Sequence, residues 1–141
     1  MTEHGKCHCG QTEWEVKLED KSHVLCHCNT CKQLGGGTYS LNQIVPKDNL
    51  KITKGKPNIY TYYGDSGKAV RCYFCPNCTS HVYHHQEIMG DKIVVRTVLL
   101  DSGKNFKPSA EIFGKDRFGW EKEVATTFDV MPPSPNDKSR L

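Results

Sequence analysis

Eight cysteines in three separated groups constrain this chain more than any other feature of its sequence. The groups have the forms C-x-C, C-x-C-x-x-C and C-x-x-C-x-x-C, and their members are Cys7 and Cys9; Cys26, Cys28 and Cys31; Cys72, Cys75 and Cys78. Residues 1–7 contain no apolar stretch that could act as a secretion signal, so we expect an intracellular, cytoplasmic protein. Disulfides are rare in reducing compartments, and closely spaced cysteines there are typical of metal ligands.

The third group contains a tight knuckle, Cys75-Pro76-Asn77-Cys78, whose turn lets two sulfurs converge on one ion. Zinc in a structural site takes four ligands, so the knuckle needs a second pair. Cys7 and Cys9 can supply that pair. We therefore predict a closed, structural zinc site of four cysteines, which fastens the first strand to the middle of the sheet.

The second group, Cys26, Cys28 and Cys31, supplies three ligands from one short segment. Three ligands leave one tetrahedral position open, which is typical of a reactive zinc site. Two other interpretations remain. Cys72 could fill the fourth position and close the site, or the spacings could hold an iron–sulfur cluster. We expect two zinc ions, one structural and one of catalytic type.

Short strands separated by turn signals predict an all-β fold, a zinc-pinned, multi-stranded β-sheet sandwich. Residues 11–17 alternate between apolar and polar side chains, with Trp14 and Val16 on the buried face. Trp120 is also expected in the core, with a lid over the pocket as the alternative. The remaining predicted strands are 23–26, 39–45, 50–54, 58–63, 68–74, 81–85, 93–100 and 110–113. One helical turn is expected over 29–34.

Composition and charge limit the domain organisation and the partners. The chain has 141 residues, of which 36% are hydrophobic, and this predicts one folded domain. We place that domain at residues 1–125, followed by a C-terminal extension at 126–141 that is disordered at its end. No apolar run is long enough to span a membrane. The net charge of +3 is dispersed along the chain, which argues against nucleic acid as a partner.

The chain contains three ordered motifs, Gly5-x-Cys7-x-Cys9-Gly10, then Cys26-His27-Cys28-x-x-Cys31-Lys32-x-x-Gly35, and Arg71-x-x-Phe74-Cys75-Pro76-x-Cys78-x-Ser80. Together they resemble the glutathione-dependent formaldehyde-activating enzyme family, which also includes centromere protein V. The resemblance covers about residues 4–125. Two features depart from the family pattern. Cys72 is additional, and Thr79 stands where the family has glycine, so we expect the chain to leave the knuckle by a different path.

The resemblance implies a fold of the β-tent type, a structural zinc on Cys7, Cys9, Cys75 and Cys78, and a catalytic-type zinc on Cys26, Cys28 and Cys31. It also implies a carbon–sulfur lyase of detoxification, which forms S-(hydroxymethyl)glutathione from glutathione, the cosubstrate, and formaldehyde. Glutathione carries two carboxylates and needs cationic or backbone donors. Lys32, Gln33 and Gly35 directly follow the cysteine triad and are the predicted glutathione-binding residues.

Other functions remain open at this point. The chain could act on another glutathione adduct in specialised metabolism. It could instead be a zinc-stabilised binding module without catalysis, or a glutathione carrier without turnover. An open three-cysteine zinc site favours the enzyme, whereas a binding module of the centromere type predicts a long basic extension that this sequence lacks.

Overall fold

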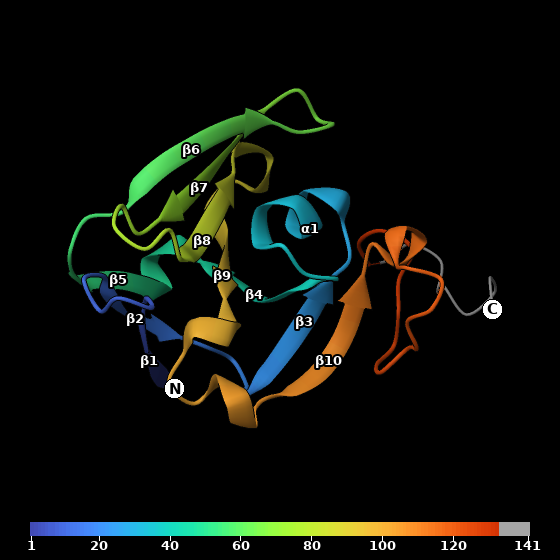
Figure 1. Cartoon of the computed structure of the whole chain (residues 1–141), viewed down its shortest axis with the longest axis horizontal. Helices are drawn as coiled ribbons and strands as arrows, with labels where there is room; N and C mark the ends of the chain where they lie inside the picture. Colours follow the sequence, from blue (N-terminus) through green and yellow to red (C-terminus); the bar gives the residue numbers. More distant parts are fainter. Residues whose placement is uncertain (133–141) are drawn as a thin grey trace. The chain divides into compact units, whose positions relative to one another are not determined.

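Strands dominate the computed structural model, which describes residues Met1–Pro132, and this confirms the all-β prediction (Figure 1). The chain forms two compact units. The first contains Met1–Lys21 and Gln43–Asn105, and the second contains Ser22–Asn42 and the described residues from Phe106 onward. Within the described residues no helix is long and apolar enough to cross a membrane.

A three-stranded antiparallel sheet lies in the first unit, with the order β1-β2-β5. The strands are β1 (Thr2–Lys6), β2 (Glu13–Lys17) and β5 (Leu50–Lys54). Trp14 and Val16 of β2 are buried, as their alternation predicts. Gly5 of β1 faces Trp14, where a Cβ atom would lie 2.5 Å from the indole ring. Polar β1 was not predicted, because its residues lack apolar alternation.

The first unit also contains an antiparallel meander, which runs through β6 (Asn58–Tyr63), β7 (Ala69–Phe74), β8 (His81–Gln86) and β9 (Lys92–Arg96). The predicted strand 93–100 is wrong in its second half, because a 3₁₀ turn covers Thr97–Leu99. That turn points both Thr97 and Leu100 into the interior, at 0% and 4% exposure. A strand would have placed these two residues on opposite faces.

The second unit is built on two parallel strands, β3 (Ser22–Cys26) and β10 (Lys107–Ile112), which lie side by side (Figure 1). β4 (Ser40–Pro46) pairs with β3 in the antiparallel direction. The helix α1 (Asn29–Gly35) follows β3 and ends at Gly36, whose φ of 70° lies in the left-handed region.

Four further 3₁₀ turns lie among the described residues. Three belong to the first unit, Lys47–Asn49, Glu87–Met89 and Gly103–Asn105, and Gly114–Asp116 belongs to the second.

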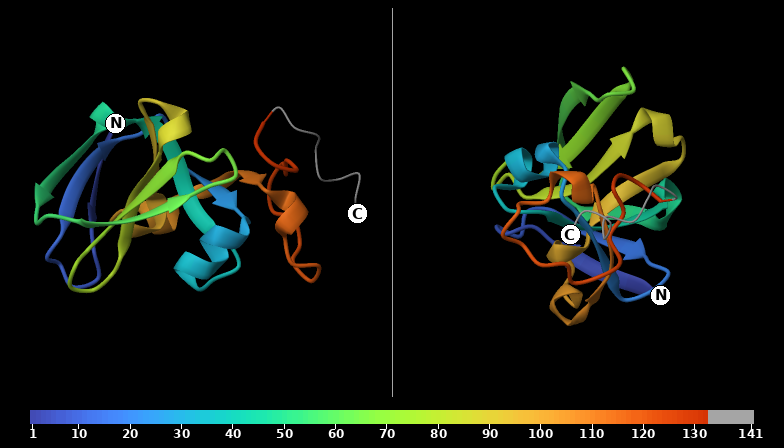
Figure 2. Two further views of the ribbon diagram at one scale, coloured as in Figure 1. Left: turned by 90° about the horizontal axis from the view of Figure 1, so that it is seen from above. Right: turned by 90° about the vertical axis from the view of Figure 1, so that its right-hand side faces the viewer.

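After β10 the chain folds back along that strand, and Figure 2 shows the loops that it forms in orange and red. The Phe128 N–H donates to the Glu111 carbonyl (2.8 Å), and the Phe113 N–H donates to the Val130 carbonyl (3.0 Å). Residues 126–130 therefore hydrogen-bond with β10. The tail expected to be disordered begins at Met131, and its residues 133–141 lie outside the described residues.

Candidate metal centres

Four cysteines of the first unit bring their sulfurs together, as the sequence predicts. The Sγ atoms of Cys7, Cys9, Cys75 and Cys78 all lie within 4.8 Å of one another. The Cys7–Cys9 and Cys9–Cys75 sulfur separations are 3.6 Å and 3.7 Å. A zinc ion with four sulfurs at about 2.3 Å requires sulfur–sulfur separations of about 3.8 Å in a tetrahedron. These distances fit a tetrahedral metal site and are far too long for disulfide bonds.

Donors from the surrounding chain point at the same sulfurs. The Thr12 N–H donates to Cys7 Sγ at 3.3 Å, and Ser80 Oγ lies 3.3 Å from Cys78 Sγ. The Ser80 hydroxyl, followed by its backbone N–H, lowers the pKa of the Cys78 thiol to about 5. The backbone N–H of Cys78 likewise lowers the pKa of Cys75. Both shifts favour thiolates, the form of cysteine that binds metals.

Thr79 closes the knuckle with a φ of 68°, in the left-handed region. The expectation of a different path was therefore wrong, because the chain makes the turn with a strained β-branched residue. Thr79→Gly should stabilise the protein by about 1 kcal/mol, since glycine adopts this conformation without the steric cost. Thermal unfolding of the zinc-loaded protein measures this. Thr79→Ala keeps the positive φ without the branch and should gain less; a melting temperature of Thr79→Gly at or below wild type would contradict the argument.

The second cluster gathers Cys26, Cys28 and Cys31 in the second unit, where their Sγ atoms lie within 4.8 Å of one another. Cys26 ends β3, and Cys28 caps α1 by accepting a hydrogen bond from the Cys31 N–H at 3.3 Å. The first turn of the helix thus brings the Cys28 and Cys31 sulfurs close together. The neighbouring thiols of Cys28 and Cys31, together with burial, raise the pKa of Cys26. A bound cation would reverse that effect, because it favours the thiolate.

Cys72 belongs to neither cluster. It is buried on β7 in the first unit, where it pairs across the sheet with His84. The two candidate centres therefore consist of four and three cysteines, and the eighth cysteine is part of a strand.

The predicted glutathione contacts all lie on α1. Gln33 and Gly35 are exposed, together with the following Gly36 and Gly37. Lys32 is half-buried, and its ammonium group contacts the Asp116 carbonyl, lies 3.4 Å from Asn29 Oδ1 and sits 4.2 Å from the centre of the Phe118 ring. Lys32 therefore connects α1 to the loop after β10, in addition to any contact with a ligand.

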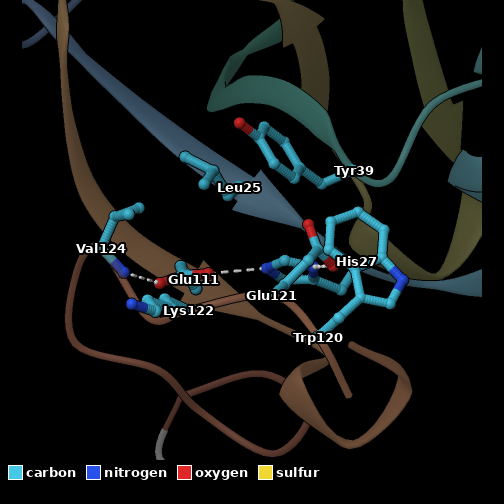
Figure 3. A pocket seen from close by; sticks show the side chains of 8 residues that line it. All are labelled: Leu25, His27, Tyr39, Glu111, Trp120, Glu121, Lys122 and Val124. Atoms are coloured by element: carbon cyan, nitrogen blue, oxygen red, sulfur yellow. Dashed lines mark hydrogen bonds and ion pairs between the residues drawn. The ribbon is translucent and has the colours of Figure 1, made fainter. Parts of the chain in front are cut away.

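Sequence reasoning missed a buried contact between a histidine and a carboxylate behind β3, in the pocket that Figure 3 shows. His27 Nε2 lies 2.7 Å from Glu111 Oε1, and both side chains are 1% exposed. Burial by itself would raise the pKa of Glu111, but hydrogen bonds from the Val124 and Ala125 N–H groups and from His27 outweigh it, so the pKa is lowered. The two partners are 84 residues apart, and no local pattern announces such a pair.

The loop after β10 also corrects the prediction for Trp120. Its side chain is 73% exposed rather than part of the core. The ring stacks on Phe118 with a centroid separation of 5.8 Å and an interplanar angle of 11°. A large apolar residue close to the C-terminal end of the chain was assigned to the core from its type alone, and its type does not fix its burial.

Comparison with known proteins places this arrangement in context. A crystal structure of a Rhodobacter sphaeroides protein shares the fold, with a TM-score of 0.56 and 23% identity over 70% of this chain and 87% of that one. A Fusarium vanettenii protein named "Putative glutathione-dependent formaldehyde-activating enzyme" is 26% identical over 80 residues, which are 55% of this chain and 42% of that protein.

An Aspergillus flavus protein with the same name is 27% identical over 84 residues, which are 58% of this chain and 43% of that protein. The chain thus spans less than half the length of these curated relatives. The sequence profile described as "Glutathione-dependent formaldehyde-activating enzyme" matches residues 2–116. That match contains all eight cysteines and most of the chain, and the chain therefore belongs to the glutathione-dependent formaldehyde-activating enzyme family.

Proposed function

We propose that this chain is a zinc-dependent carbon–sulfur lyase that works in the synthetic direction and joins glutathione to formaldehyde. In the reaction the thiol sulfur forms a bond to the formaldehyde carbon, the carbonyl π bond breaks, and the thiol proton ends on the oxygen. The product is S-(hydroxymethyl)glutathione. Family membership supports the two substrates. The observation that carries the proposal is the cluster of three cysteines at the start of α1.

The donor sets fit zinc at both centres. Thiolate sulfur is a preferred zinc ligand, and the first cluster offers four sulfurs at tetrahedral spacing. Cys7, Cys9, Cys75 and Cys78 would hold a structural ion, and Cys26, Cys28 and Cys31 would hold the second. When bound by three cysteines, zinc supplies an open coordination position that favours the thiolate form of an incoming sulfur.

The chain itself would orient glutathione around this position. Cys28 is fixed by its hydrogen bond from the Cys31 N–H, so the cluster does not need to rearrange when the ligand arrives. Gln33 and Gly35 are exposed on the helix that carries Cys31, where a side-chain amide and open backbone can meet the carboxylates of glutathione. Lys32 adds positive charge at the same place, although part of its hydrogen-bonding capacity is used by Asp116.

The rate at which formaldehyde and glutathione interconvert with their adduct tests this function. Exchange NMR would follow how fast formaldehyde and glutathione interconvert with their adduct, with and without the zinc-loaded protein. We expect a rate well above the uncatalysed reaction for the wild type and the uncatalysed rate for Cys28→Ser. The matched control is Cys72→Ser, which changes a buried cysteine outside both clusters and should retain the rate.

Three results would contradict the proposal in different ways. A wild-type rate equal to background would exclude formaldehyde activation. Glutathione binding without a rate effect would identify a carrier. Equal loss of rate in Cys28→Ser and Cys72→Ser, with both proteins folded, would show that the rate does not depend specifically on the three-cysteine cluster.

A further inference from the structure

Three sheet edges in the described part of the chain are protected against pairing with another chain. An edge strand presents unpaired N–H and C=O groups, which proteins cover or surround with charge. The edge of β10 is covered, because residues 126–130 hydrogen-bond along it. β1 is partly covered, because its His4 carbonyl accepts the Asp101 N–H at 2.8 Å. β5 carries two charged residues, Lys51 and Lys54, among its five.

β6 has neither protection. It is the last strand of the meander, drawn in green in Figure 1, and among the described residues β7 is the strand that pairs with it. Its sequence, Asn58-Ile59-Tyr60-Thr61-Tyr62-Tyr63, contains no charge, and five of its six residues are β-branched or aromatic, the types that favour strands. Ile59, Tyr60 and Tyr63 are 51%, 50% and 73% exposed. β6 is therefore an open edge with a high preference for strand pairing.

The turn after β6 shows which backbone groups face this open edge. The Gly64 N–H donates to the Lys68 carbonyl at 3.3 Å, in the same register as the pairing of β6 with β7. Pairs with and without backbone hydrogen bonds alternate along an antiparallel ladder. Every second residue back from Gly64 therefore bonds to β7. The residues between them, Ile59, Thr61 and Tyr63, direct their N–H and C=O groups to the outer edge.

We propose that the outer edge of β6 pairs in the antiparallel direction with the same edge of a second copy of this chain, around a twofold axis at Thr61. This register places Thr61 opposite Thr61 and Ile59 opposite Tyr63, the latter twice by symmetry. All three outward-facing residues then exchange both backbone hydrogen bonds, about six in total. A shift by two residues in one direction would place Tyr63 opposite Pro57, which has no N–H. The opposite shift would place Ile59 opposite Asp65, beyond the end of the strand.

Charges at the two ends of β6 support a second copy as the partner. Lys56 lies two residues before the strand and Asp65 lies two residues after it, and both are exposed. Antiparallel pairing brings Lys56 of each copy to the end of the strand where Asp65 of the other copy lies, so opposite charges approach. Parallel pairing would bring like charges together. The edge of β6 is thus complementary to itself in charge and in hydrogen bonding.

The proposed contact is small and is separate from the chemistry of the protein. One strand pair buries less surface than a standard protein–protein interface, so we expect a reversible dimer with a dissociation constant on the order of 100 µM. β6 contains no cysteine and contributes to neither candidate metal centre. The proposal is therefore independent of the function proposed above.

Sedimentation velocity of the zinc-loaded protein tests the pairing, over concentrations from about 10 µM to about 1 mM. We expect the sedimentation coefficient of the wild type to rise with concentration. Thr61→Lys places two like charges opposite each other at the twofold axis and should weaken the dimer at least about tenfold. The matched control is Thr53→Lys, the same change at an exposed position of the edge strand β5, which should dimerise as the wild type does.

A mixture of two variants tests the register. Thr61→Lys and Thr61→Glu each oppose like charges when alone, whereas a mixed dimer places a positive charge opposite a negative one. We expect each variant to sediment as a monomer and the mixture to associate, with an effect that decreases at high salt. Thermal unfolding of each variant checks that it is folded, which the exposure of Thr61 predicts.

Three outcomes would overturn the proposal. A wild type that stays monomeric at about 1 mM would exclude self-pairing and leave the edge of β6 to a strand of a different protein. Dimerisation of Thr61→Lys with wild-type affinity would show that the contact lies elsewhere on the surface. A mixture of the two variants that fails to associate would contradict antiparallel pairing around Thr61.

Discussion

Replacing Cys7 by serine is expected to reduce zinc content from about two ions per chain to about one and to destabilise the protein by at least about 3 kcal/mol. Cys7 is 2% exposed and stands at the centre of the four-cysteine cluster, where its sulfur accepts the Thr12 N–H. Serine is a poor zinc ligand, and the remaining three sulfurs come from segments that the ion would otherwise hold together. Metal analysis and thermal unfolding measure the two effects.

The control for this substitution is Cys72→Ser. It also places a hydroxyl at a buried cysteine position, but on β7 outside both clusters. We expect Cys72→Ser to retain about two zinc ions and to lose no more stability than the burial of a single hydroxyl costs, about 1–3 kcal/mol. If Cys7→Ser kept full zinc content, the assignment of a structural zinc to this cluster would be wrong.

Glu111→Gln is expected to cost about 3–5 kcal/mol, although the side chain keeps its size. Oε1 of Glu111 faces His27 Nε2, while Oε2 accepts from the Val124 N–H at 2.7 Å and the Ala125 N–H at 3.1 Å. A glutamine amide has one acceptor and one donor group, so it cannot accept on both sides as the carboxylate does, and its NH₂ must face either the Val124 and Ala125 N–H groups or His27 Nε2. The loop that carries Trp120 would lose part of its attachment to the Glu111 side chain, while the backbone hydrogen bonds between residues 126–130 and β10 remain. Urea unfolding measures the loss, with Glu123→Gln as the matched control.

The stability difference between the wild type and Glu111→Gln depends on pH because the pKa of Glu111 is lowered in the folded protein. A carboxyl whose pKa is lower in the folded state than in the unfolded state stabilises the fold above its unfolded pKa, about 4.3. The stability gap between wild type and Glu111→Gln should therefore be constant above about pH 5 and shrink as the pH falls through the folded pKa of Glu111. A gap that grows towards acid would contradict the ionised state of this residue.

The sequence predicts the local features of this protein better than the pairing of segments that are far apart in the chain. Closely spaced cysteines predicted each local group, because a knuckle or a helix start brings such neighbours together without help from the rest of the chain. The joining of Cys7 and Cys9 to the knuckle was predicted instead from the four ligands that a structural zinc requires. The alternation of Trp14 and Val16 predicted β2 for the same local reason. β1 is polar and forms only because β2 is available as a partner, and no pattern within it indicates a strand.

Long-range pairings set the features that could not be predicted. The contact of His27 with Glu111 joins residues 84 positions apart, and it creates a pocket that neither segment suggests alone. The exposed position of Trp120 depends on the path of the loop after β10, which is fixed by hydrogen bonds to Glu111. The 3₁₀ turn at Thr97–Leu99 likewise interrupts the apolar run 93–100, which by itself predicts a longer strand.

The separation of the cysteines along the chain also bears on how the protein matures. Cys26, Cys28 and Cys31 are complete as a cluster as soon as residue 31 has been synthesised. The other cluster must bring Cys9 to Cys75 across 66 residues, and it cannot close until Cys78 has left the ribosome. Closing a long loop costs entropy that a local cluster avoids. With zinc as the ion, a nascent chain would therefore complete the proposed three-cysteine centre first, and the proposed four-cysteine centre could close only later in synthesis.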